Sequence, residues 1–140
     1  MDVEKRNETL ASGNSLYQFG LPRAKDSDNY YGARVEFLTD QRVVVVFEKR
    51  IAGTRTQVGS YTTVSREKHA ANVWFWVRAQ AQGKSPTTLR IKVWRDGTPE
   101  PAAWDYQRTD SSTSLQGAGG NRRAVGDAQP DQEHAGALLL

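Results

Sequence analysis

The chain has 140 residues, no cysteine, and 19 lysine and arginine residues against 16 aspartate and glutamate residues, which gives a formal net charge of +3. This length allows one domain, and the lack of cysteine excludes a disulfide framework and any cysteine-based metal site. The charge is too small for a dedicated nucleic-acid binder, so we do not expect a nucleic-acid partner.

The start of the chain is polar. We expect residues 1–13 to form a lead-in to the domain, with the alternative that they supply part of a first strand. Residues 1–8 lack the apolar stretch of a secretory signal, so the chain as written is expected to stay in the cytoplasm. No apolar run approaches the length of a membrane span, and we expect no membrane partner.

Period-2 alternation predicts the strands of the first half. A short strand is expected over 15–21, and a second over 30–38. Residues 42–50 include four consecutive valines followed by Phe47, which predicts a strand buried on both faces. Residues 55–63 alternate again and predict a further strand.

The second half continues the pattern. Residues 73–81 and 88–95 alternate strictly, and a shorter strand is expected over 104–108. The turn at Asp96-Gly97 is followed by two prolines, which forbid further strand pairing there. Strands at this spacing, with almost no helical periodicity, predict an antiparallel β-sandwich over 14–116.

Three segments resemble a known family. They are Tyr-Tyr-Gly-Ala-Arg-Val-Glu-Phe at 30–37, Ser-Pro-Thr-Thr-Leu-Arg-Ile-Lys-Val-Trp at 85–94 and Gly-Thr-Pro-Glu-Pro-Ala-Ala-Trp at 97–104. In these segments the chain is similar to the concanavalin A-like, or laminin-G-like, jelly-roll modules of secreted multi-domain actinobacterial proteins. The similarity covers about 14–119 and implies a jelly-roll sandwich used as a glycan-binding or spacer module.

The two ends depart from that family. The initial strands that the family carries upstream of Asn14 are not found, so the resemblance implies an incomplete jelly roll from a larger extracellular protein. From Gly117 the alternation stops, and residues 117–140 are expected to be a disordered tail. One GC-rich reverse translation of 120–136, shifted by one nucleotide, reads as a strand-like segment, so out-of-frame translation is a second interpretation of the tail.

Catalytic patterns are absent from the sequence. Glycoside hydrolases of this fold need paired carboxylates on one strand, and neither Glu-x-Asp-x-Glu nor Glu-x-x-Asp-x-x-Glu occurs. Glu36, Asp40 and Glu48 are therefore expected to be solvated surface groups. The two histidines, His69 in a polar loop and His134 in the tail, have no nucleophile context. We expect a protein that is not an enzyme.

A metal site has only a weak signal. Asp26-Ser27-Asp28-Asn29 resembles half of a calcium loop, but the Gly and Glu that complete such a loop are missing. Asp and Asn also gather in turns because their side chains bond the local backbone, and that interpretation is favoured. If a cation binds, Asp26 and Asp28 are its expected ligands and calcium the expected ion.

The aromatic residues carry the main functional signal. Trp74, Trp76 and Trp94 alternate with apolar residues on predicted strands that also carry Arg78 and Arg90. Sugars stack their C–H faces on aromatic rings, so these five residues and Tyr31 are the candidate ligand-binding residues. Single-stranded nucleic acid uses similar ingredients, and tryptophans buried between the sheets are the commoner arrangement.

The sequence thus predicts a non-catalytic carbohydrate-binding or accessory module with a polysaccharide partner. The alternative is a structural or spacer module, of the cell-surface or phage-tail type, without a small ligand.

Overall fold

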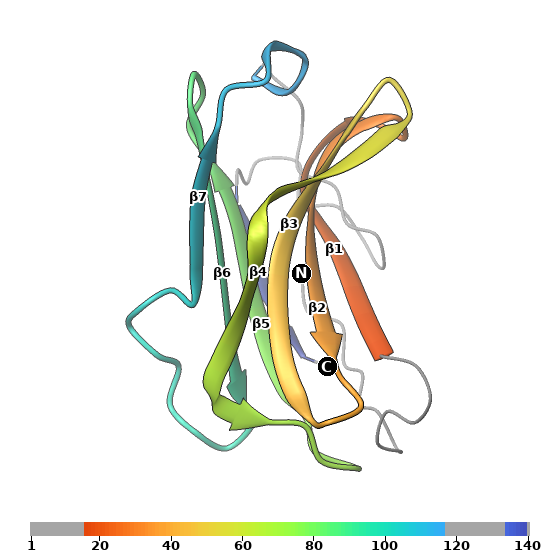
Figure 1. Ribbon diagram of the computed structural model, residues 1–140. Helices are drawn as coiled ribbons and strands as arrows, with labels where there is room; N and C mark the ends of the chain where they lie inside the picture. The colour runs from red at the N-terminus through yellow and green to blue at the C-terminus, as the bar shows by residue number, and fades with distance from the viewer. Residues whose placement is uncertain (1–15, 117–133, 140) are drawn as a thin grey trace.

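Two antiparallel sheets pack face to face in the computed structural model, which describes residues 16–116 and 134–139 (Figure 1). The first sheet has the order β1-β2-β3-β4, from β1 (Leu16–Asp26), β2 (Asn29–Phe37), β3 (Arg42–Ile51) and β4 (Thr54–Lys68). The second has the order β7-β6-β5-β8, from β5 (Phe75–Gln82), β6 (Thr87–Arg95), β7 (Tyr106–Asp110) and β8 (His134–Leu139). The predicted all-β antiparallel sandwich is confirmed.

Helical structure in the described part of the chain is limited to one short 3-10 turn, η1 (Thr113–Leu115). None of the described segments is a helix long and apolar enough to cross a membrane.

The core lies between the sheets, as the alternation predicted. The residues of β2 at 31, 33, 35 and 37 are all buried, and Leu89, Ile91 and Val93 of β6 belong to the same cluster between the sheets. The valine run of β3 is buried on both faces, which is also confirmed. Val44 is buried on the outer face of the first sheet, because it lies outside the inter-sheet cluster.

β4 is longer and less regular than predicted. Val58 pairs with Phe47 and Thr62 with Val45, so three residues of β4 lie opposite one residue of β3. Gly59 begins this bulge with φ +76°, a conformation that glycine adopts at little cost. Because the bulge adds two residues, it preserves which side chains of β4 face the core.

The edge of β6 beyond β7 is closed by side chains. β7 pairs with β6 only as far as Ile91. Further along, the Asp105 carboxylate accepts a hydrogen bond from the Val93 N–H at 2.9 Å, and Arg66 donates to the Val93 carbonyl at 2.7 Å. Glu67 accepts from the Arg95 N–H at 3.0 Å. These groups satisfy an edge that would otherwise be open to another strand.

The C-terminal segment differs in part from the prediction. Residues 134–139 form β8, which pairs antiparallel with β5, so the prediction of disorder to residue 140 is corrected for these six residues. Without β8, the backbone groups of β5 on that side would lack a strand partner, and satisfying them favours the pairing. The predictions for 1–13 and 117–133, including the shifted reading frame, lie outside the described residues.

Candidate functional site

Five of the six candidate residues lie on the outer face of the second sheet. They come from alternating positions of β5 and β6 and from the residue before β5: Trp74, Trp76, Arg78, Arg90 and Trp94. None of the described tryptophans belongs to the cluster between the sheets. The interpretation that buries the tryptophans between the sheets is therefore wrong, because Phe75, Val77, Leu89 and Val93 fill that face instead.

Trp76 and Trp94 form the centre of this face. They are cross-strand partners, and their rings lie nearly parallel, 16° apart, with centroids separated by 6.4 Å. The Trp76 indole Nε1 donates to the Asp96 carboxylate at 2.8 Å, which fixes the ring orientation. Trp94 is only 6% exposed, whereas Trp76 is half-buried. Trp76 is thus the more accessible ring of the pair for a ligand. Trp94 packs beside it on the neighbouring strand.

The loop between β6 and β7 folds back beside this aromatic pair. Its Glu100 carboxylate lies 2.9 Å from the Arg78 guanidinium and 3.1 Å from the Lys92 ammonium. The Lys92 ammonium also donates to the Pro101 carbonyl at 2.8 Å. Burial opposes the ionisation of Glu100, but hydrogen bonds from Lys92 and Arg78 outweigh it and lower the pKa of Glu100. The loop neutralises part of the positive charge on this face.

Arg90 extends the face towards β7. Its Nε donates to Gln107 at 3.1 Å, and another of its nitrogens donates to Gln80 at 3.3 Å. The Trp104 ring lies under the charged ends of Arg90 and Lys92, which are 5.8 Å and 4.8 Å from its centroid. Trp104 was not among the predicted site residues. Its place on this face depends on the path of the loop, which local alternation does not encode.

Tyr31 does not belong to this face. Its ring is 0% exposed in the core, so the prediction that Tyr31 stacks on a ligand is corrected. Its hydroxyl donates to Asp110 at 2.6 Å and accepts from Gln116 at 2.8 Å. Tyr31 was chosen for its residue type, whereas its position on β2 turns it inward with Ala33 and Val35.

Tyr31 is part of a buried polar network at one end of the core, called here the end network. The Asp110 carboxylate also accepts from the Lys49 ammonium at 2.7 Å, and the Gln116 carbonyl oxygen accepts from the Thr87 hydroxyl at 2.8 Å. Burial opposes the ionisation of Asp110, but hydrogen bonds from Lys49 and Tyr31 outweigh it and lower the pKa of Asp110 to about 2. The network connects both sheets and the η1 segment. Its hydrogen bonds hold these elements together.

The predicted calcium ligands lie in the β1–β2 turn. The Asp26 carboxylate accepts from the Asp28 N–H at 2.8 Å and from the Asn29 amide at 2.9 Å, and these bonds lower the pKa of Asp26. The Asp28 carboxylate lies 3.4 Å from the Arg50 guanidinium. The acidic side chains thus serve the turn, as the favoured interpretation predicted. Within the described ranges, no group of three or more acidic or histidine side chains could hold a metal ion.

The remaining titratable candidates are also engaged or enclosed. The Arg34 guanidinium lies 3.4 Å from Glu36 and 3.0 Å from Glu48, so these carboxylates share a cation on the outer face of the first sheet. His69 was expected in a polar loop but is 3% exposed, with its ring 4.5 Å from Phe37. Burial lowers the pKa of His69.

Comparisons of the chain with models of protein families, with curated proteins and with solved structures found no match.

Proposed function

We propose that this chain is a non-catalytic carbohydrate-binding module that uses the outer face of its second sheet. The observation that carries the proposal is the half-buried Trp76, held parallel to Trp94 and fixed by Asp96 on a face pointing away from the core. A partly exposed aromatic ring that is held rigidly is a surface on which a sugar ring stacks with little loss of conformational entropy.

The polar groups beside Trp76 suit the same ligand. Arg78 and Gln80 follow Trp76 on the outer face of β5, and both are half-buried. They offer hydrogen-bond donors and an amide carbonyl, which complement the mixed donors and acceptors of a neutral glycan. Because Glu100 pairs with Arg78 and Lys92, it offsets part of the positive charge on this face, which makes the face less suited to a nucleic acid.

The resemblance of residues 30–37, 85–94 and 97–104 to concanavalin A-like modules points to the same class of ligand. The proposal follows it in treating the chain as an accessory module of a larger extracellular protein. The second candidate is a spacer without a ligand, and it is favoured by the loop at 96–105, which already occupies Lys92 and part of Arg78.

A Trp76→Ala variant separates these two functions. Binding to a panel of insoluble and soluble polysaccharides should be lost, while the free energy of unfolding falls by about 1 kcal/mol, less than the ~3–5 kcal/mol typical of a core tryptophan. Thr56→Ala, an exposed position on the other sheet, is the control and should leave binding unchanged. If the folded wild-type chain binds none of the polysaccharides, the result contradicts the proposal and favours the spacer function.

Salt dependence provides an independent check. Sugar stacking is largely insensitive to ionic strength, so the affinity for a bound polysaccharide should change little between low and high salt. A single-stranded nucleic acid that bound with a steep salt dependence would contradict the proposal.

A further inference from the structure

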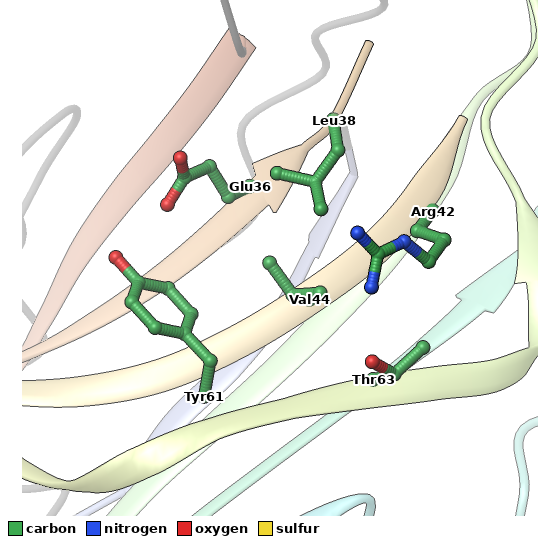
Figure 2. A pocket seen from close by; sticks show the side chains of 6 residues that line it. All are labelled: Glu36, Leu38, Arg42, Val44, Tyr61 and Thr63. Atoms are coloured by element: carbon green, nitrogen blue, oxygen red, sulfur yellow. The ribbon is translucent and has the colours of Figure 1, made fainter. Parts of the chain in front are cut away.

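The outer face of the first sheet carries a depression of about 360 Å³ that the second-sheet site does not involve. It is called here the Tyr61 depression. Its lining comes from β2, β3, β4 and the residues that follow β2: Glu36, Leu38, Arg42, Val44, Tyr61 and Thr63 (Figure 2). The depression is open to solvent, and its volume is at the lower end of the range of small-molecule sites in proteins.

The floor of the depression is apolar and the wall is aromatic. Val44 is buried here although it lies outside the inter-sheet core, and Leu38 is half-buried beside it. Tyr61 is 37% exposed and is the only large apolar side chain of the described residues that is exposed to this degree. One open aromatic ring above an apolar floor offers a flat ligand both a stacking surface and a dry contact.

The backbone of β4 is irregular on both sides of this position. The bulge that begins at Gly59 precedes Tyr61, and a second register shift follows Thr63, where Val44 and Arg42 pair with Thr63 and Lys68. Bulges redirect side chains and occur frequently beside binding sites. The strand thus departs from regular pairing at the residues that form the wall of the depression.

The polar rim offers both donors and acceptors. The Tyr61 hydroxyl points toward the Glu36 carboxylate (Figure 2), and burial together with a hydrogen bond to Glu36 raises the pKa of Tyr61. Arg42 is held at the rim by Asp40, with its Nε 2.7 Å from the carboxylate. Thr63 adds a hydroxyl. The charges on the rim are of both signs and largely compensated, which suits a neutral ligand rich in hydroxyl groups.

We propose that the Tyr61 depression binds a single neutral pyranose ring, which makes the module a two-site glycan binder with one site on each sheet. The inference takes its ligand class from the proposed function and rests on it to that extent, but it concerns a different surface. Two sites on one rigid module would raise avidity for a polysaccharide that can reach both.

Chemical-shift mapping tests the inference on the full 140-residue chain. A ¹⁵N-labelled sample is titrated separately with the methyl pyranosides of glucose, galactose, mannose, xylose and N-acetylglucosamine. At least one sugar should shift the backbone amides of Val44 and Thr63 in a saturable manner. The indole N–H of Trp76 reports on the second sheet in the same spectra.

Three variants sharpen the result. Tyr61→Ala should weaken binding at Val44 and Thr63 about tenfold, and Tyr61→Phe, which keeps the ring, should weaken it less. Thr56→Ala, an exposed position on the same strand away from the depression, is the matched control and should leave the affinity unchanged. Tyr61 is exposed, so its variants are expected to fold, and the dispersion of the spectra verifies this.

The outcomes separate the inference from the proposed function. Shifts confined to the Trp76 indole overturn the inference and leave the proposed function standing. Shifts at Val44 and Thr63 that persist unchanged in Tyr61→Ala also overturn the inference. If no sugar shifts either group of reporters and no polysaccharide binds, both are wrong.

Discussion

The two ends of the core treat buried polar groups in opposite ways. At one end, Tyr31 and Asp110 are held in the end network, where each makes hydrogen bonds of 2.6–2.8 Å. At the other end, His69 is buried between Phe37 and Phe75, and neither of its ring nitrogens has a hydrogen-bond partner in the described part of the chain. The two positions lie near opposite ends of β2. Tyr31 of β2 belongs to the end network, and Phe37 of β2 contacts His69.

This difference indicates which end of the core fixes the alignment of the two sheets and which end tolerates substitution. A buried polar group with full partners fixes the relative position of the strands that supply those partners, because any shift leaves a group unsatisfied. A buried histidine without partners adds only apolar packing and carries a desolvation cost. We therefore expect the end network to define the alignment of the two sheets and the His69 end to tolerate substitution.

The largest effect should come from Asp110→Ala. It removes the acceptor of Tyr31 and the counter-ion of Lys49, and we expect a loss of about 3 kcal/mol in the free energy of unfolding, measured by urea denaturation. Asp96→Ala is the matched control, because Asp96 also accepts a hydrogen bond from an aromatic side chain but lies on the surface. Equal losses in the two variants would contradict the comparison.

Low pH should reduce the contribution of the end network to the free energy of unfolding. The pKa of Asp110 is about 2 in the folded chain, below its value in the unfolded chain, so its contribution is fully present above about pH 4. This contribution, about 2 kcal/mol, is lost as the pH falls from about 4 through 2. Urea titrations of the wild-type chain and of Asp110→Asn should show this loss only in the wild type.

Tyr31→Phe should have a smaller effect. The substitution keeps the ring in the core but leaves Asp110 and the Gln116 amide each without one partner, which should cost about 1–2 kcal/mol. Thermal unfolding of Tyr31→Phe beside that of the wild type measures the effect. Polysaccharide binding should be unchanged, since Tyr31 is buried, and a loss of binding would return Tyr31 to the ligand site.

The smallest effect has the opposite sign. His69→Phe replaces an unpartnered imidazole with an apolar ring of similar size and should raise the free energy of unfolding by about 1 kcal/mol. Burial lowers the pKa of His69, so the wild type should lose stability as the pH falls below about 6.5, where the unfolded chain takes up the proton. That dependence should be absent in His69→Phe. A destabilised variant would show that His69 has a partner.

Part of the candidate site could be predicted from the sequence. Trp76 and Arg78 alternate with Phe75 and Val77, and this period alone places the two pairs on opposite faces of one strand. Which pair faces inward could not be predicted, because a tryptophan and a phenylalanine are both common in cores. Phe75 packs in the core beside Phe37 of β2, and this packing turns Trp76 outward.

Other parts of the site depend on contacts between distant segments. Glu100 meets Arg78 from 22 residues away, and Tyr31 meets Asp110 from 79 residues away. No local pattern records these separations. The Tyr61 depression likewise depends on the bulge at Gly59, and a lone glycine in an alternating strand indicates a bulge without showing which side chains it redirects.

The class of the fold follows from local sequence patterns, because alternation and turn residues act over a few neighbouring positions and need no partner. These patterns also determined which residues share a face of each strand. Which face of each strand is buried, how residues 134–139 pair with β5, and which charges on the outer faces are neutralised depend on the tertiary structure. These outcomes depend on the packing of one sheet against the other, which brings together residues far apart in the chain.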